Sequence, residues 1–388
     1  MSSNDHILGD PTAIRTDLAA IFVSLELSRR TWLVTSLLPG SEKMSRHAVP
    51  AGAVGDLLTL LGRRRAAAAA RGEGEYRMVA IQEAGLDGFW LHRVLEAEGI
   101  ESHVVDAASI AAPRRRRRAK SDRIDGESLL RVLLAYKRGE PRVCSMVRPP
   151  SPAAEDRRRV SRERRTLVAQ RIEEVNRIKG LLFSPGVFDD EPRSRHRHER
   201  LDTLRTGDGR PLPEHLKRQV GRELERLELV EAQIKQVEAE RDALLAAPQD
   251  AAPEGAKSRL TQLVSIGPEF ASVLEAEAFW RRFDNRRQLA AYAGLAPTPW
   301  QSGSIAREQG VSKAGNPRLR TTMIQLAWLW LRHQPQSDLS RWFQHRVRHG
   351  GGRIRKTGIV ALARKLLIAL WRFERCGELP AGAQVKPA

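Results

Sequence analysis

Residues 20–38 read Ala20-Ile-Phe-Val-Ser-Leu-Glu26-Leu-Ser-Arg-Arg-Thr31-Trp-Leu-Val-Thr-Ser-Leu-Leu38, and this stretch decides the fold of the amino-terminal part of the chain. It holds two apolar, β-branched runs separated by Ser28-Arg29-Arg30, a composition typical of two strands joined by a tight turn. Residues 43–49 continue the pattern as a candidate third strand. The chain therefore opens with three expected neighbouring strands.

Beyond these strands, the apolar pattern alternates between the helix period and the strand period. The candidates are a helix over 54–65, a strand over 77–82, a helix over 89–98, a strand over 101–106 and a helix over 122–136. Three strands followed by alternating helices and strands predict a mixed sheet with helices packed on it, in the order of the RNase H-like fold. We expect this α/β domain to span residues 18–148, after a loose tail at residues 1–17.

The composition shifts at Pro149 toward arginine and glutamate. Apolar residues then recur at three-and-four spacing, which predicts two long charged helices with narrow apolar seams. Such helices form either an antiparallel hairpin within one chain or a coiled coil between chains. We assign residues 149–250 to this segment, with a loop near 183–213. A mostly helical domain follows over residues 256–378, and residues 379–388 form a tail.

The net charge points to a polyanionic partner. Lys and Arg number 66 against 47 Asp and Glu, which gives a formal net charge of +19 over 388 residues. This excess favours binding to a phosphate backbone, and the alternative is an arginine-rich proteome without such a partner. Cys144 and Cys376 are too isolated for a disulfide framework or a zinc ribbon. With no apolar run of membrane-spanning length and no secretory signal, we expect a reduced, cytoplasmic protein.

Four acidic residues stand where they could share a metal site. Glu26 and Glu83 close apolar strands, and Asp122 and Asp125 open a helix three residues apart. Carboxylates at strand ends meet at one edge of a sheet, and hard oxygen ligands of this kind suit Mg²⁺, with two ions able to clamp a phosphodiester. For Asp122 the alternative is a helix cap, and for Asp125 a favourable charge in the first helical turn.

A second candidate site surrounds Ser302. Its hydroxyl lies between glycine-containing segments and is followed by a group of cationic residues: Arg307, Lys313, Arg318 and Arg320. This composition suits a serine nucleophile beside an anion-binding loop, because positive charge stabilises a developing phosphate anion. Ser304 and Ser312 are competing nucleophiles, and a plain Ser-Gly turn in a basic loop is the non-catalytic alternative.

Two further basic segments are candidates for contacts to a nucleic-acid backbone. The first precedes the aspartate pair directly and comprises Arg114, Arg115, Arg116, Arg117, Arg118 and Lys120. The second follows three consecutive glycines and comprises Arg353, Arg355 and Lys356. We expect the second segment to be a flexible basic loop.

Taken in order, these motifs resemble those of the DEDD-type insertion-sequence transposases. In the amino-terminal part, the resemblance rests on Glu26-Leu-Ser-Arg-Arg-Thr-Trp32, Glu83-Ala-Gly85 and Lys120-Ser-Asp-Arg-Ile-Asp125. In the carboxy-terminal part, it rests on the Gly-Leu-x-Pro, Ser-Gly and Lys-x-Gly-Asn-x-x-Leu-Arg motifs within 294–320. The resemblance covers about residues 20–375 and includes both domains. It implies a RuvC-like amino-terminal domain and a carboxy-terminal domain that carries a catalytic serine.

The resemblance also implies an activity and its partners. The family is understood as RNA-guided DNA recombinases, so it implies that Ser302 attacks a DNA phosphodiester with help from metal ions held by the four acids. Donor and target DNA would be the substrates, and a non-coding RNA would supply the guide. Because one polypeptide cannot hold four DNA ends, we expect dimers and tetramers, in contact through the long helices. The resemblance also implies a bacterial protein that is associated with the nucleoid.

One departure from the family pattern bears on activity. The first acid is Glu26, where the family has Asp, and the added methylene moves the carboxylate outward by roughly one carbon–carbon bond of ~1.5 Å. Mg²⁺ prefers near-octahedral geometry, so this change allows an altered or inactive metal site. Two alternatives therefore stay open: a catalytically decayed nucleic-acid-binding protein, and a hydrolytic RuvC-like junction nuclease in which Ser302 is idle.

Overall fold

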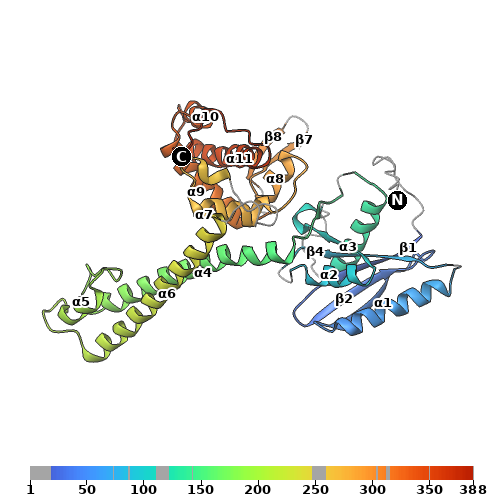
Figure 1. The fold of residues 1–388 in the computed structure, drawn as a ribbon, viewed down its shortest axis with the longest axis horizontal. Coiled ribbons are helices and arrows are strands. Elements are labelled where there is room, and N and C mark those ends of the chain that lie inside the picture. Colours follow the sequence, from blue (N-terminus) through green and yellow to red (C-terminus); the bar gives the residue numbers. More distant parts are fainter. Residues whose placement is uncertain are drawn as a thin grey trace. The chain divides into compact units, whose positions relative to one another are not determined.

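The computed structural model describes residues 19–72, 74–85, 88–110, 122–141, 143–246, 259–302, 305–311, 315–348 and 350–387, with the backbone alone at 108, 122–124, 298–302 and 305–309. The chain divides into two compact units, Met1–Pro150 and Ser151–Ala388, whose elements are labelled in Figure 1. Among the described helices, none is long and apolar enough to cross a membrane.

The first unit is built on a six-stranded mixed sheet with the order β3-β2-β1-β4-β5-β6. Its strands are β1 (Ala20–Glu26), β2 (Thr31–Leu37), β3 (Ser45–Pro50), β4 (Arg77–Glu83), β5 (Glu101–Val105) and β6 (Met146–Val147). The first three pair antiparallel, β4 and β5 run parallel to β1, and the short β6, which the sequence did not predict, adds an antiparallel edge. This arrangement confirms the expected α/β fold of RNase H-like order.

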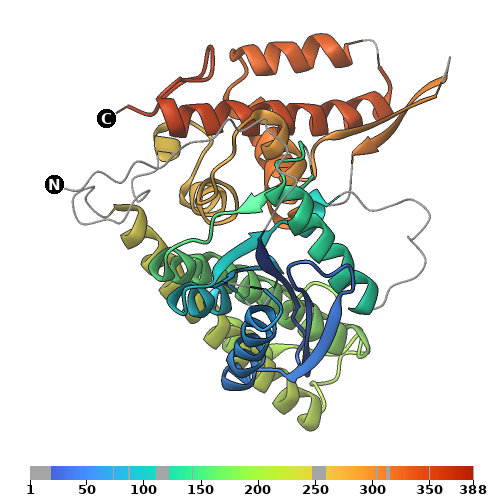
Figure 2. The ribbon, with the colours of Figure 1, turned by 90° about the vertical axis from the view of Figure 1, so that its right-hand side faces the viewer.

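Helices cover both faces of this sheet, as Figure 2 shows. On one face α1 (Val54–Ala69) and α2 (Trp90–Ala97) pack against Val23 and Leu25 of β1. On the other face α3 (Asp122–Lys137) buries Leu130 and Leu133 against Phe22. A short 3-10 turn, η1 (Ala107–Ser109), follows β5. The strand residues alternate between the two cores, as the pleat of a strand requires.

The second unit begins with a long helical hairpin made by α4 (Pro152–Phe183) and α6 (Glu214–Ala246). The carboxy-terminal half of α4 packs Ile178 against Leu224 near the start of α6, and Leu167 packs against Ile234 farther along. The helices are therefore antiparallel and pair within one chain. The connection was expected to be a loop, but it contains a short helix, α5 (Arg197–Thr203).

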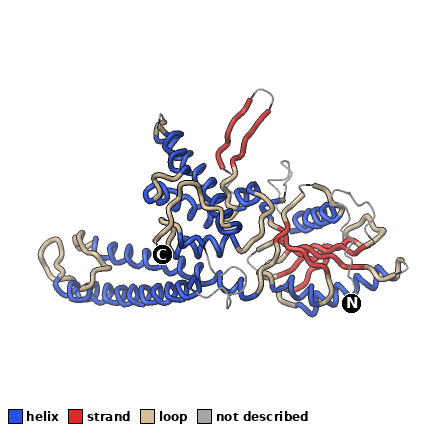
Figure 3. Tube along the Cα trace, turned by 45° about the horizontal axis from the view of Figure 1, so that its top comes forward, coloured by secondary structure: helices blue, strands red, loops and turns tan. Residues whose placement is uncertain are grey.

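The remainder of the second unit is helical around one apolar core, with a two-stranded β-hairpin projecting from it (Figure 3). Its elements are η4 (Arg259–Gln262), α7 (Pro268–Leu274), the π-helical turn η5 (Glu275–Phe279), α8 (Arg286–Tyr292), β7 (Pro297–Ser302), β8 (Ile305–Val311), α9 (Pro317–His333), α10 (Asp338–Val347) and α11 (Gly352–Cys376). Trp330 is fully buried at the centre of the core.

The carboxy-terminal segment folds back onto this helical core. Gln334 accepts a hydrogen bond of 2.8 Å from the backbone N–H of Gln384, and Lys386 Nζ donates to the carbonyl oxygen of Thr261 at 2.7 Å. Val385 forms a β-bridge with Leu263. Residues that the sequence suggested were a tail are thus held by specific contacts as far as Lys386.

Candidate functional site

Glu26 and Glu83 occupy the ends of neighbouring parallel strands. β1 and β4 pair in register up to the residues just before them. Because side chains alternate along a strand, Glu26 shares its face with Phe22, and Glu83 shares its face with Ile81. Phe22 and Ile81 both pack in the core formed with α3. The two carboxyl-bearing positions therefore lie at one edge of the sheet, on the face that α3 covers.

The start of α3 is held against the same end of β1. The hydroxyl of Ser24 donates a 2.7 Å hydrogen bond to the carbonyl oxygen of Gly126, and Ser24 is fully buried. Ser24 precedes Glu26 by two residues, so it points toward the α3 face as well. Gly126 directly follows Asp125, and Asp122 opens the helix. The backbone thus brings all four acidic positions to one edge of the sheet.

The chemistry of this set fits a hard divalent cation, since carboxylate oxygens are the ligands that Mg²⁺ prefers. Glu26 and Asp125 are half-buried and Glu83 is exposed, whereas the side chain of Asp122 lies outside the description. Within the described residues, no three His, Cys, Asp or Glu side chains are grouped closely enough to hold an ion. The fold therefore places the four acidic positions at one edge, and the described side chains of Glu26, Glu83 and Asp125 do not form a closed metal site.

Ser28 organises the turn that follows Glu26. Its hydroxyl donates to the carbonyl oxygen of Thr31 at 2.6 Å and accepts from the backbone N–H of Thr31 at 3.1 Å and of Arg30 at 3.4 Å. Such side-chain bonds to the backbone stabilise tight turns. The serine of the Ser-Arg-Arg-Thr motif is therefore a turn residue that fixes where β1 ends.

Several predicted positions lie outside the described residues. They are Arg114, Arg115, Arg116, Arg117, Arg118, Lys120, Ser304, Ser312 and Lys313. Their roles stay predictions from the sequence.

Ser302 is the last residue of β7, where it pairs with Ile305 at the start of β8. The sequence suggested an irregular glycine-rich loop here, and the structure instead forms an antiparallel hairpin. Arg307 lies in β8, opposite Trp300. The hairpin places Ser302 next to its turn, at the end remote from the helices that anchor both strands (Figure 3).

The base of this hairpin is closed by a tight backbone contact. Gly315 has φ +97°, and a Cβ built on it would lie 2.5 Å from the carbonyl oxygen of Tyr292. The backbone N–H of Asn316 donates to that same oxygen at 2.7 Å. Only glycine combines a positive φ with such a close approach. The glycine of the Lys-x-Gly-Asn motif therefore joins the segment entering the hairpin to the segment leaving it.

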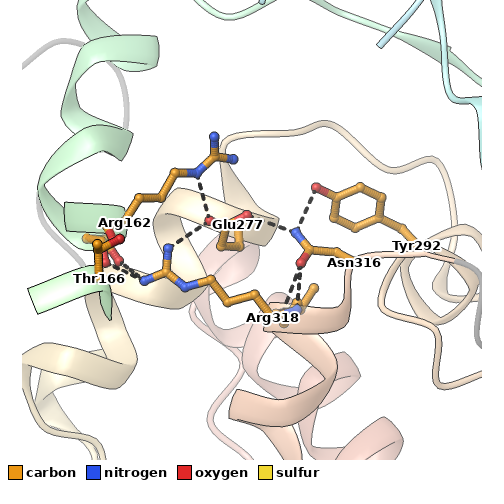
Figure 4. A network of polar contacts seen from close by, with 8 residues as sticks. Arg162, Thr166, Glu277, Tyr292, Asn316 and Arg318 are labelled. Carbon is orange, nitrogen blue, oxygen red and sulfur yellow. Dashed lines mark hydrogen bonds and ion pairs between the residues drawn. The ribbon is translucent and has the colours of Figure 1, made fainter. Parts of the chain in front are cut away.

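Asn316 and Arg318 continue this motif into a buried polar network around Glu277, drawn in Figure 4. Asn316 caps α9 by accepting from the backbone N–H of Arg318, and its amide donates to Glu277 at 2.8 Å. Arg318 reaches Glu277 at 3.0 Å and donates to the hydroxyl and carbonyl oxygens of Ser161 on α4 at 2.6 Å. Arg162 of α4 bonds Glu277 at 3.2 Å.

This network determines what its charged groups can do. Burial raises the pKa of Glu277, but hydrogen bonds from Asn316 and Arg162 and the positive charges of Arg162 and Arg318 outweigh it, so the pKa lies below its usual range. Arg318, expected to contact phosphate, is instead buried and engaged inside the protein. Arg320, half-buried one turn into α9, also has an interaction within the chain.

Arg353, Arg355 and Lys356 lie in the first turns of α11, which starts at Gly352. They were expected in a flexible loop, but they are exposed helical residues. The guanidinium of Arg355 stacks over the ring of Trp328 at 5.4 Å, and that ring is 40% exposed. A helix therefore presents three cations beside a partly exposed aromatic ring.

The ion pairs show which cationic side chains are already neutralised by a carboxylate and which could bind a polyanion. Along the α4–α6 hairpin, arginines pair with glutamates of the same hairpin, as with Arg177 and Glu223 at 3.5 Å or Arg197 and Glu231 at 2.9 Å. In contrast, across the part of the chain that the structure describes, no carboxylate pairs with the three cations at the start of α11. A polyanion would meet cations without a described carboxylate partner there, whereas many cations of the α4–α6 hairpin are paired.

Sequence reasoning missed Glu277, Ser161 and Gly126. Glu277 carried a usable signal, because a charge within the apolar run Ala276-Glu-Ala-Phe279 is costly without a partner. It also lies in a π-helical turn, a feature frequent at functional sites. Ser161 and Gly126 carried no signal of this kind, since their roles depend on contacts across 157 and 102 residues of sequence.

Comparison with known proteins agrees with the motifs. The family described as transposase IS116/IS110/IS902 matches residues 257–340, and the IS110-type DEDD transposase family matches residues 44–184. A Sinorhizobium fredii protein named transposase y4rJ is 63% identical over 388 residues, covering 97% of each chain. A Yersinia enterocolitica transposase for insertion sequence element IS1328 is 27% identical over 241 residues, which are 59% of this chain and 68% of the relative.

The DEDD-type match spans the boundary between the two units and includes Glu83, Asp122 and Asp125, whereas the match over 257–340 lies within the second unit and includes Ser302. The identity to the Sinorhizobium fredii protein extends over 97% of this chain, and therefore over both units. The chain therefore belongs to the IS110 family of DEDD insertion-sequence transposases, enzymes that cut and rejoin DNA.

Proposed function

We propose that this transposase exchanges DNA strands with two sets of residues: the acids at the sheet edge, Glu26, Glu83, Asp122 and Asp125, and the nucleophile Ser302. The observation that carries the proposal is the anchoring of α3 on β1. The Ser24–Gly126 hydrogen bond holds the helix that bears two of the acids against the strand that bears a third.

The four acids would hold Mg²⁺, in a two-ion arrangement. When bound, such ions stabilise charge on the attacking and leaving oxygens of a phosphodiester. The residues themselves supply negatively charged oxygen ligands on two strand ends and one helical turn. Glu26 reaches farther than an aspartate, and it is the last residue of β1.

Ser302 would carry the covalent step. Its Oγ forms a bond to the phosphorus of one DNA strand, while the bond from phosphorus to one bridging oxygen breaks. The serine hydroxyl loses its proton, and the leaving oxygen gains one to become a strand-end hydroxyl. Attack by the hydroxyl end of a second strand on the phosphoserine reverses these changes and restores Ser302. The number of phosphoester bonds is unchanged, so the exchange needs no separate energy source.

Basic residues would hold the nucleic acids. Arg353, Arg355 and Lys356 have no carboxylate partner in the described part of the chain, and Trp328 beside Arg355 offers a surface for a base. The arginine run at 114–118 with Lys120 would contact backbone near the acidic edge, and Arg307 and Lys313 would do so near Ser302. A non-coding RNA would select the donor and target DNA. Because four DNA ends take part in an exchange, the working form would be a dimer or tetramer of this chain.

The decisive test is a search for the covalent intermediate. A labelled DNA duplex carrying the element end, incubated with protein, guide RNA and Mg²⁺, is resolved on a denaturing gel. A protein–DNA adduct that is lost in Ser302→Ala and retained in the matched control Ser304→Ala supports the proposal. Free cleaved ends without adduct, unchanged in Ser302→Ala, would instead support a hydrolytic nuclease. Binding without any cleavage would support a decayed binding protein, which the Glu26 substitution makes a real alternative.

A further inference from the structure

We infer that Ser24, Thr35 and Gly126 are positioning residues that set the distance between α3 and the sheet, and thereby where Asp122 and Asp125 stand relative to Glu26 and Glu83. This inference rests on the proposed metal site. None of the three residues touches a ligand in this role; each acts through the helix that carries the aspartates.

The helix approaches the sheet unusually closely at Gly126. A Cβ built on this glycine would lie 2.8 Å from Oγ1 of Thr35 on β2, closer than real Cβ contacts come. Thr35 is fully buried, and its Oγ1 has no hydrogen-bond partner among the described residues. The hydroxyl of Ser24 on β1 closes the other side of the contact through its bond to the Gly126 carbonyl oxygen.

Thr35 cannot easily move away from a methyl group at position 126. Thr35 is β-branched, so rotation about its χ1 would only exchange the hydroxyl for a methyl group of similar size. Its backbone is paired with both β1 and β3. An alanine at position 126 would therefore displace the helix, not the strand.

Glycine at this position also runs against local preference. Gly126 lies within α3, where glycine is less favourable than alanine by about 1 kcal/mol in general. Close approach of helix to sheet explains its presence. Any outward shift of α3 would carry Asp125, the adjacent residue, and Asp122, one turn earlier, away from the strand ends.

The test uses a steric rescue with a volume-matched control. Tb³⁺ luminescence, with competition by Mg²⁺, is measured on the full-length protein for Gly126→Ala, for Gly126→Ala with Thr35→Ala, and for Gly126→Ala with Thr35→Val. Thr35→Ala makes room for the new methyl group, whereas Thr35→Val keeps the crowding. Gly62→Ala, at a glycine of α1 with open space around it, is the control for a helical Gly-to-Ala change.

We expect Gly126→Ala to weaken ion affinity roughly tenfold or more, as loss of residues that orient metal ligands commonly does. The double change with Thr35→Ala should recover most of that affinity, and the one with Thr35→Val should not. Wild-type affinity in Gly126→Ala, or equal affinity in both double variants, overturns this inference while leaving the metal site intact. Unchanged affinity in both Asp125→Asn and Glu83→Gln overturns the proposed metal site, and this inference with it.

Discussion

The guanidinium of Arg318 lies 3.0 Å from the carboxylate of Glu277, and the two side chains are only 9% and 4% exposed. Arg318 lies two residues after Asn316, which closes the base of the β7–β8 hairpin, while Glu277 also bonds Arg162 of α4. One buried carboxylate therefore ties together the π-helical turn, the start of α9 and the long helix.

Removing the carboxylate should destabilise the second unit strongly. Glu277→Ala leaves the Arg318 guanidinium buried without its counter-charge, and breaking a buried pair in this way costs about 3–5 kcal/mol. Thermal unfolding followed by circular dichroism provides the measurement. Arg341→Ala removes an exposed pair with Asp338 and should change stability by less than about 1 kcal/mol. Equal effects of the two substitutions would contradict the assigned role of the buried pair.

Two glycine substitutions should act in opposite directions. Gly315→Ala introduces a methyl group 2.5 Å from a backbone carbonyl at φ +97°, so it should lower the unfolding temperature and abolish adduct formation at Ser302. Gly180→Ala adds a methyl group in open space within α4 and should stabilise the protein by about 1 kcal/mol. Normal adduct yield in Gly315→Ala would show that the hairpin base does not govern the serine.

At the acidic edge, Asp125→Asn should abolish DNA cleavage and leave nucleic-acid binding nearly unchanged. Replacing a charged oxygen ligand by a neutral amide weakens ion binding far more than it alters phosphate contacts. Cleavage gels and gel-shift assays on the same preparation separate the two effects. Glu26→Asp, which restores the residue usual in the family, should keep activity; its complete loss would mean that the site depends on the longer side chain.

Glu101 should give the first unit an acid-sensitive stability. Its hydrogen bond with His103, 2.7 Å away, and its contact with Lys137 at 2.6 Å lower its pKa from 4.5 to about 2. A carboxyl group with a lowered pKa stabilises the fold above its unfolded pKa, and the contribution is lost as the pH falls from about 4.5 toward 2. Glu101→Gln should therefore lower the unfolding temperature at pH 7 and flatten its decline between pH 5 and pH 2. An unchanged pH profile in this variant would contradict the assignment.

Arg353, Arg355 and Lys356, which pair with no carboxylate among the described residues, should contribute to the salt dependence of nucleic-acid binding. Each phosphate contact contributes about 0.9 to the slope of log K against log salt for duplex DNA. Replacing Arg353, Arg355 and Lys356 by alanine should reduce that slope by roughly two to three in fluorescence-anisotropy titrations. The matched control is Arg193→Ala, which removes an arginine between α4 and α6 that pairs with Glu231. This substitution should leave the slope unchanged. An identical slope in the triple variant would exclude this surface as a major contact.

The regular elements of the first unit were predictable because each depends on local pattern. The apolar runs at 20–26 and 77–83 form β1 and β4, and the fully buried residues within them explain the continuous hydrophobic sequence. The β7–β8 hairpin was not predictable in the same way. Its first strand contains Pro297 and Pro299, residues unfavourable in strands, so its pairing depends on the partner strand and the anchored base.

The roles of individual residues also divide into those that the sequence predicts and those that depend on the tertiary structure. Sequence alone determined the order of the main strands and helices of the first unit, the positions of the acids at strand and helix ends, and the family, since these follow from hydrophobic period and short motifs. Only the tertiary structure decided that Arg318 is a buried ion-pair partner of Glu277, and that α3 comes close to β2 at Gly126. Both outcomes depend on burial and on contacts between residues more than 40 positions apart, and no local pattern encodes the distance between two such side chains.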